Sequence, residues 1–172
     1  MELSNLVACI CEGSAEKAIM RLFLENDLLI FKTENLLDED VLSYRDGKPF
    51  EERYLRKGFD GKISVASILD SHRENFRLSK AYKEKVSVIN VVTAPEIEML
   101  IILSEGRYNQ FKKSGKKPSA FGKEDLKMGN VKEYTVVRDY FSDTGRLISA
   151  VREYDRITKK KPGEFVLADL LK

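Results

Sequence analysis

The stretch ACICEGSAEKAIM (residues 8–20) joins the features that decide the fold. A run of small and apolar residues over 5–11, typical of a buried strand, ends abruptly at Glu12-Gly13. An apolar stripe then recurs at helical spacing through 14–25, with Ser14 at the expected N-cap position. A carboxylate between a buried strand and a helix must find a partner, face water or hold a cation. This junction is therefore the first candidate for a functional site.

Three later segments have the apolar, β-branched composition of strands, namely 28–31, 62–69 and 86–92. Together with 5–11 they predict an α/β fold with a parallel sheet of about four strands flanked by helices. The segment 28–31 follows the first helix directly, so the chain is expected to open with a β-α-β unit. Acids, glycines and a proline interrupt the pattern over 32–60 and indicate an insertion with about one helix.

The rest of the chain reads as helical. A helix is expected to start at Thr93-Ala94-Pro95, where proline is tolerated in the first turn, and to continue toward Tyr108. A basic loop with some local structure is expected over 112–127. Two helices are expected within 131–158, split at Asp143-Thr144-Gly145. The tail, 164–172, is apolar enough to dock against the rest of the protein.

Length and composition limit the classes of protein. A chain of 172 residues favours one domain, with a core over 1–105 and a basic and helical part over 106–172. No apolar run approaches the length of a membrane span and no secretory leader is visible, so we expect a cytoplasmic protein without a membrane partner. Cys9 and Cys11 point to the same face of a strand, and packed thiols suit a reducing compartment.

Charge is balanced overall but not locally. The chain has 30 Lys and Arg against 28 Asp and Glu, a net charge of +2. Residues 107–132 hold eight Lys or Arg against two acids, whereas 34–52 holds seven acids against two bases. A basic segment suits phosphate groups, and the other interpretation is an ordinary solvated loop.

Two predicted parallel strands, 5–11 and 62–69, each end in a carboxylate, Glu12 and Asp70. Ligands of open α/β sheets bind outside the carboxyl ends of strands, where strand order reverses, so the two acids are expected to lie close together. Neighbouring carboxylates repel unless one is protonated or a cation lies between them, and Mg²⁺ prefers such oxygen ligands. Alternatively, Glu12 accepts backbone N–H bonds at the helix start, Asp70 caps the next segment, and His72 is a loop residue.

Neighbouring residues carry two further expectations. Gly13 would leave room for a phosphate or metal to approach the backbone. Glu96 and Glu98 lie about 200° apart on a helix, so they do not face one site together. One of them is then expected to be an ordinary solvated glutamate of the first helical turn.

Three motifs resemble those of a known family. ICEGSAEKAIM resembles the first motif of Toprim domains, a strand ending in Glu-Gly before a helix, and is closest to compact Toprim proteins of the RloB and OLD-nuclease type. SILDSHRENF resembles their second motif, a strand ending in Asp-x-Asp. APEIEMLIIL resembles a later motif of the RloB-like group. The three matches lie within residues 5–103.

The resemblance implies a Toprim-like sheet and a site that acts on phosphodiesters. It implies Glu12 and Glu98 as catalytic residues, and Asp70, His72 and Glu16 as ligands of Mg²⁺ or Mn²⁺. The second motif departs from the family pattern because His72 replaces its second acid. Imidazole is a poorer ligand for Mg²⁺ than a carboxylate and a better one for Mn²⁺.

These features lead to one main functional hypothesis and two others. The main one is a metal-dependent nuclease or related phosphoryl-transfer protein in a bacterial or phage conflict system, beside a partner ATPase. Its nucleic acid would be held by the lysines of the basic segment, Lys112, Lys113, Lys116, Lys117 and Lys123. The second is an inactive Toprim-like interaction subunit that docks a partner protein through 34–52 and the tail. A nucleotide-binding sensor ranks last because no Gly-rich phosphate loop is present.

Overall fold

The computed structural model describes residues 3–59, 61–71 and 75–172, and these form an α/β fold. Its sheet contains three parallel strands, β1 (Leu6–Cys11), β2 (Ile63–Leu69) and β3 (Val86–Val92), in the order β1-β2-β3. All residues of β2 are buried, as both faces of the sheet are covered. The predicted α/β class with a parallel sheet is confirmed, with three strands in the described chain rather than about four.

The predicted strand over 28–31 is wrong. This segment makes a single antiparallel bridge, Leu29 to Leu171, and its apolar pattern reflects burial under the C-terminal tail. The chain instead returns to the sheet over 36–42, which runs beside β1 through two isolated parallel bridges. Because β1 lies between 36–42 and β2, the direction of chain progression across the sheet reverses at β1. This is the kind of switch point at which α/β folds place ligands.

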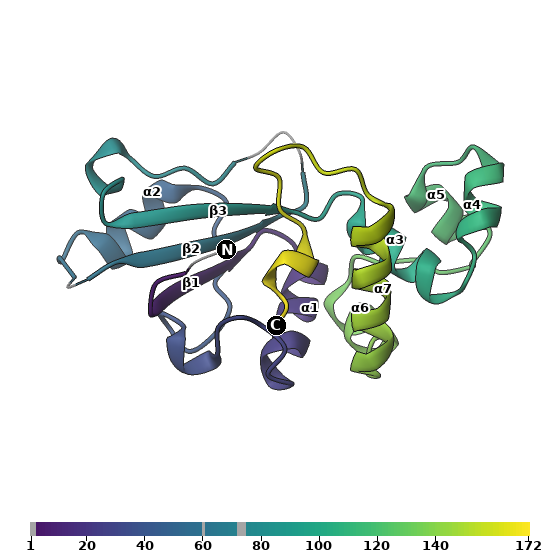
Figure 1. Ribbon diagram of the computed structural model, residues 1–172, viewed down its shortest axis with the longest axis horizontal. Helices are drawn as coiled ribbons and strands as arrows, with labels where there is room; N and C mark the ends of the chain where they lie inside the picture. The colour runs from purple at the N-terminus through teal and green to yellow at the C-terminus, as the bar shows by residue number, and fades with distance from the viewer. Residues whose placement is uncertain (1–2, 60, 72–74) are drawn as a thin grey trace.

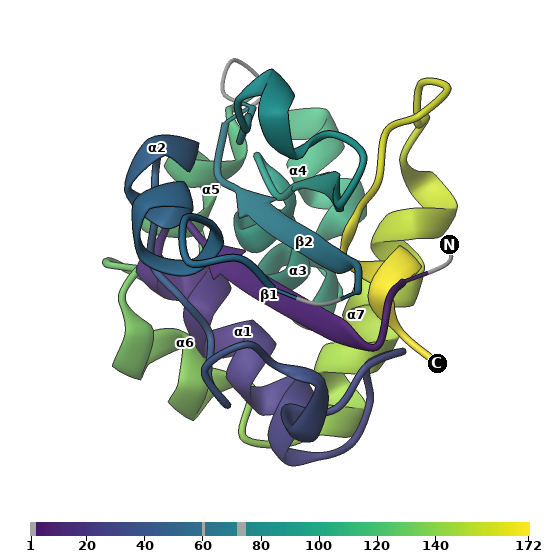
Figure 2. The same cartoon turned by 90° about the vertical axis from the view of Figure 1, so that its left-hand side faces the viewer.

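The first helix, α1 (Ser14–Glu25), has the predicted bounds, although its N-cap residue is Gly13 rather than Ser14. Its apolar stripe, which includes Ile19 and Phe23, packs with Cys9 and Cys11 in the larger hydrophobic core. Figure 2 shows α1 against one face of the sheet, with α2 (Gly47–Phe50) on the other side. Both cysteines are buried free thiols, as the sequence predicts.

The other face of the sheet is covered by the insertion and by the loop before β3. The insertion contains η1 (Thr33–Asn35), α2 (Gly47–Phe50) and the π-helical turn η2 (Glu51–Leu55). Phe50 is the centre of a small aromatic cluster, with ring centroids 5.1 Å from Tyr54 and 5.8 Å from Phe76. This second core therefore joins strand residues with Phe50, Leu55 and Phe76 from segments that read as irregular in the sequence.

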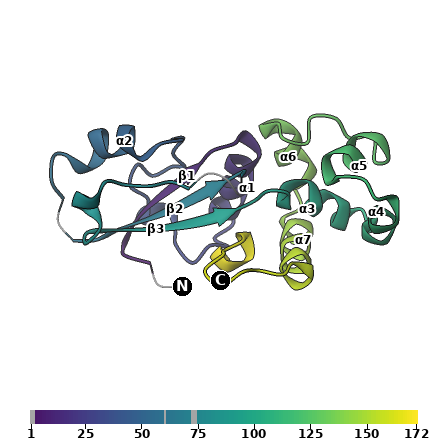
Figure 3. The ribbon, with the colours of Figure 1, turned by 90° about the horizontal axis from the view of Figure 1, so that it is seen from above.

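The helical part begins after β3 and extends away from the sheet (Figure 1). Its elements are α3 (Glu96–Ser104), α4 (Tyr108–Ser114), α5 (Pro118–Glu124), α6 (Tyr134–Tyr140), α7 (Thr144–Ile157) and η4 (Leu167–Leu170), and η3 (Lys80–Tyr82) precedes β3. In Figure 3 the arrows of β2 and β3 point toward α3. The carboxyl ends of the strands thus face the helical part.

One helix prediction in this part needs correction. The helix expected to run toward Tyr108 ends at Ser104, because Gly106 adopts a left-handed conformation (φ 64°) and α4 starts anew. The local structure expected within the basic loop is the end of α4 together with α5. The two helices expected within 131–158 are confirmed, and the Asp143 side chain caps α7 by accepting from the backbone N–H of Gly145.

The C-terminal tail docks as expected. Leu167 and Leu170 are fully buried, and the Leu170 carbonyl accepts a hydrogen bond from Ile30 N. Phe165 O accepts from Val92 N, so the tail also covers the carboxyl end of β3. No helix among the described residues is long and apolar enough to cross a membrane.

Glu96 and Glu98 are both buried, which overturns the expectation that one of them is solvated. Glu96 is enclosed because the tail folds over the start of α3, a long-range contact without a local sequence signal. Its Oε2 accepts a long hydrogen bond from Leu167 N at 3.4 Å, and its Oε1 has no hydrogen-bond partner among the described residues. Burial raises the pKa of Glu96 to about 8.

We predict that Glu96→Gln stabilises the protein relative to the parent at pH 8 more than at pH 5. The pKa of Glu96 rises from 4.5 to about 8 on folding, so the folded state binds more protons between these values. Stability from the protonated carboxyl is complete below the lower value and falls by up to about 1.4 kcal/mol per pH unit as pH rises through the window. Urea unfolding of both proteins at several pH values measures the difference. A difference that does not change with pH would contradict the prediction.

Candidate functional site

Glu12 and Asp70 lie side by side at the carboxyl ends of β1 and β2. The ladder pairs Cys11 with Ile68, and Glu12 N extends it by donating to Ile68 O at 3.1 Å. The Glu12 side chain then turns toward β2, where its Oε2 accepts from Asp70 N at 3.3 Å. Parallel pairing in this register is what brings together two acids that are far apart in the sequence.

The Glu12 carboxylate is enclosed, with its side chain only 7% exposed. Its Oε1 lies 3.9 Å from the Arg45 Nε, which belongs to the insertion and is itself largely exposed. The backbone N–H that donates to Glu12 Oε2 comes from the end of the neighbouring strand. Glu12 is thus a buried acid beside an accessible cation.

Glu16, one helical turn further on, is buried and bonded to the end of β3. Its Oε1 lies 2.9 Å from Thr93 Oγ1, which is also 2.9 Å from the Leu69 carbonyl. The Thr93 hydroxyl donates to Glu16 Oε1 and shares its proton with the Leu69 carbonyl. Burial is the main cause that raises the pKa of Glu16; the charge of Asp70 adds to it, and the hydrogen bond from Thr93 lowers it.

Gly13 makes room for Glu16 rather than for a ligand, which corrects the expectation from the sequence. Its backbone is extended (φ −104°, ψ 164°), so the glycine is not required by conformation. A Cβ atom at this position would lie 2.1 Å from Glu16 Oε2. The space expected to admit a phosphate or metal is occupied by this carboxyl group.

Glu98 faces a different side of α3 from Glu96, as their spacing requires. Its Oε1 lies 3.8 Å from the Lys132 Nζ, and Lys132 also lowers the pKa of Glu16 through its charge. A pocket of about 260 Å³ adjoins this pair and is lined by Glu98, Lys123 and Lys132 among other residues. Lys132 therefore connects Glu98 with the acids at the ends of the strands.

Lys132 and Arg45 were not singled out from the sequence. Arg45 is one of two bases in an acidic segment, and Lys132 is one of eight in a basic one, so neither pattern distinguishes them. Only the fold brings them to the acids from the two sides of α1.

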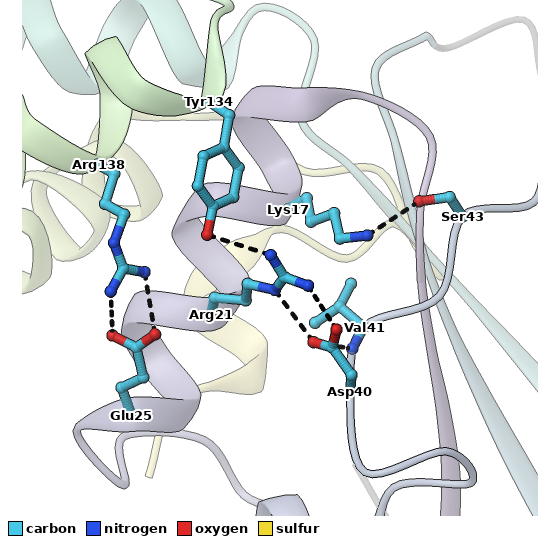
Figure 4. Close-up of polar contacts among 8 residues, drawn as sticks. All are labelled: Lys17, Arg21, Glu25, Asp40, Val41, Ser43, Tyr134 and Arg138. Carbon is cyan, nitrogen blue, oxygen red and sulfur yellow. Dashed lines mark hydrogen bonds and ion pairs between the residues drawn. The ribbon is translucent and has the colours of Figure 1, made fainter.

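The outward face of α1 is fixed by polar contacts to the insertion and to α6 (Figure 4). Arg21 forms an ion pair with Asp40 and donates to Tyr134 OH at 3.3 Å. One turn later, Glu25 pairs with Arg138 of α6 at 2.7 Å. These contacts hold the helix that carries Glu16, and they join the two segments that supply Arg45 and Lys132.

The lysines of the basic segment divide into two groups. Lys112, Lys113, Lys117 and Lys123 are exposed. Lys116 is bound to acids of α5 and the residue after it, at 2.9 Å from Glu124 and 2.6 Å from Asp125. The charge of Lys116 is therefore largely compensated by these two acids.

The proposed metal ligands are only partly described. His72 lies outside the described residues. Within 3–59, 61–71 and 75–172, no three His, Cys, Asp or Glu side chains form a group that could hold a metal ion. Comparison with family models, curated proteins and solved structures finds no match for this chain.

We predict that Gly13→Ala destabilises the protein by about 1–3 kcal/mol, the usual cost of overpacking. The new methyl group displaces the Glu16 carboxyl, which then loses its contact with Thr93. Glu16→Ala removes the displaced group, so the double variant is expected to lose less than the sum of the two single losses. Thermal unfolding of the four proteins gives the coupling energy.

Gly122→Ala is the matched control because a Cβ there meets no atom within 4 Å. It lies in α5, where alanine favours the helix, so a small gain in stability is expected. Additive losses at Gly13 and Glu16 would show that the space left by Gly13 is not needed for the Glu16 carboxyl group.

Proposed function

We propose that this protein is a Toprim-like, divalent-metal-dependent nuclease or related phosphoryl-transfer protein acting on nucleic acid. The observation that supports this most is the contact between Glu12 and Asp70 at a switch point of a parallel sheet. Two buried or half-buried acids with exposed cations close by suit a phosphodiester, whose charge the cations attract and whose cleavage needs proton transfer. A role in a bacterial or phage conflict system, with a partner ATPase, rests on the resemblance alone.

The donor set fits a hard divalent cation. Mg²⁺ is usually held by one or two carboxylates and completes its octahedron with water and substrate oxygens. Glu12 and Asp70 would be those two ligands for Mg²⁺ or Mn²⁺. When bound, such an ion supplies a polarised phosphate and a more acidic water.

The remaining residues of the site take their proposed roles from their contacts. Glu12 moves a proton at its carboxylate, and Arg45 and Lys132 attract the phosphate from opposite sides. Glu98 acts through Lys132, since its Oε1 lies 3.8 Å from the Lys132 Nζ. Glu16 fixes the end of β3 by accepting from Thr93 Oγ1, a positioning role that differs from the metal ligation implied by the resemblance.

A basic path leads from the site to the α4–α5 lobe. Lys123 lines the pocket that contains Glu98 and Lys132. Lys112, Lys113 and Lys117 are exposed on the same lobe, which Figure 1 shows at the far end of the molecule from the sheet. Phosphate contacts along this path would hold a strand without reading its sequence.

The interaction-subunit hypothesis has less support, because its expected docking surfaces are engaged within the chain. In the acidic insertion, Asp40 is bound by Arg21, and Asp38 accepts from Tyr54 OH at 2.6 Å. The apolar side chains of the tail are buried against α3 and α7. An inert parent protein in the assay below would nevertheless favour this alternative.

We predict that Glu12→Gln folds normally but loses Mn²⁺- or Mg²⁺-dependent cleavage of nucleic acid by about 100-fold or more, the scale of a lost general acid or base. The amide keeps an oxygen that accepts from Asp70 N, so little change in melting temperature is expected. Glu133→Gln makes the same change at an exposed glutamate and is expected to retain activity. Full activity of the Glu12 variant would overturn the proposed role.

We predict that Lys117→Ala weakens nucleic-acid binding more than Lys116→Ala. Lys117 is exposed, whereas Lys116 is compensated by two acids. Each phosphate contact that is lost lowers the slope of log K against log salt by about 0.7–0.9. Titrations at several salt concentrations measure that slope for both variants. Equal slopes for the parent and the Lys117 variant would show that this lysine is only a solvated surface residue.

A further inference from the structure

The outer edge of β3 is open along part of its length. In a parallel ladder, alternate residues direct their main-chain N–H and C=O groups to the same neighbour. Lys85 O accepts from Ile63 N, and Thr93 N donates to Leu69 O, so the odd-numbered residues of this segment face β2. The even-numbered residues, Val86 to Val92, therefore face away from the sheet.

Among the described residues, the tail covers the carboxyl end of this edge, where Phe165 forms a parallel bridge with Val91. Val92 N donates to Phe165 O at 3.0 Å. The parallel bridge between Val91 and Phe165 also engages the Asn90 carbonyl, whereas no contact among the described residues engages the Val88 main chain or the Asn90 N–H. The Asn90 side chain accepts from Phe76 N at 3.1 Å. The open edge is long enough for an added strand of about four or five residues.

Two pockets adjoin this edge. A pocket of about 700 Å³ is lined by apolar residues that include Phe76, Leu78 and Val88. A second pocket, of about 360 Å³, continues along Ile89 and Asn90 to the tail. An extended chain that pairs with the edge would find space for side chains at both ends of the contact.

The charges around the edge indicate what kind of chain would bind. Arg77, Lys80, Lys83 and Lys161 line the two pockets and are exposed, against a single acid, Glu164. Two-fold pairing of β3 with the same edge of a second copy would bring two such sets of cations together, which is unfavourable. An acidic segment has the complementary charge.

We propose that the edge of β3 from Val86 to Asn90 receives an extended, acidic segment of a partner protein as an added parallel or antiparallel strand. Main-chain hydrogen bonds would supply affinity, and the cations would select the acidic sequence. This surface is separate from Glu12 and Asp70, and its test does not involve nuclease activity. The competing explanation is that the lysines only protect an exposed edge from aggregation.

The test uses the whole protein and a capped peptide of about eight residues that alternates glutamate with valine. Amide exchange followed by NMR is expected to slow by about tenfold or more at Val88 and Asn90 when the peptide saturates the protein. The amides of Ser87 and Ile89 already face β2 and are expected to change little. A peptide with lysine in place of glutamate is expected not to protect either pair.

Charge reversal separates recognition from general attraction. Arg77→Glu with Lys80→Glu is expected to weaken binding of the acidic peptide by about tenfold or more, while Lys112→Glu with Lys113→Glu, the same change in net charge on the α4–α5 lobe, is expected to leave it intact. Equal binding by both peptides, no protection at Val88 and Asn90, or equal effects of the two charge reversals would overturn the proposal. If the protein self-associates in sedimentation experiments and these amides are protected without peptide, a second copy of the chain occupies the edge and the proposal is overturned.

Discussion

The hydrogen bond from Asp70 N to Glu12 Oε2 depends on one constraint, the parallel register of β1 and β2. A shift of one residue would turn every side chain of a strand to the opposite face, which would exchange Cys9 and Cys11 for the residues of the second core. Burial of both faces therefore fixes the register, and the register fixes the acids. The geometry of the site is a consequence of packing rather than of any contact within the site itself.

Glu16 adds a second constraint of the same kind, because it joins the start of α1 to the end of β3. Thr93 N and Thr93 Oγ1 both contact Leu69 O, so β2, β3 and α1 meet around one hydroxyl group. Glu16 Oε1 and the Leu69 carbonyl both accept from this hydroxyl, so the buried carboxyl is tied to the ends of the strands. Gly13 permits this arrangement by leaving the required space.

The sequence predicts β1, α1, β2 and β3 well because each has a complete local pattern of apolar residues with a clear end. It fails where tertiary contacts decide. Residues 28–31 have the composition of a strand but contact the tail, and 36–42 lies beside β1 without a regular apolar pattern. Glu96 reads as a solvated residue of a first helical turn, yet the tail buries it. Arg45 and Lys132 have no distinguishing pattern, since only the fold brings them to Glu12 and Glu98.

The acids of the site differ in how their charge is balanced, and this difference affects the chemistry that they support. Glu12 has an exposed arginine 3.9 Å away, and Glu98 has an exposed lysine 3.8 Å away, so both cations remain accessible to an incoming anion. At such distances, near the surface, each cation is held by a modest Coulomb attraction that an arriving phosphate can match. Glu16, in contrast, is buried, and its Oε1 accepts from Thr93 Oγ1. The site thus combines exchangeable surface cations with a buried acid, and the cations are accessible to an anion without opening the core.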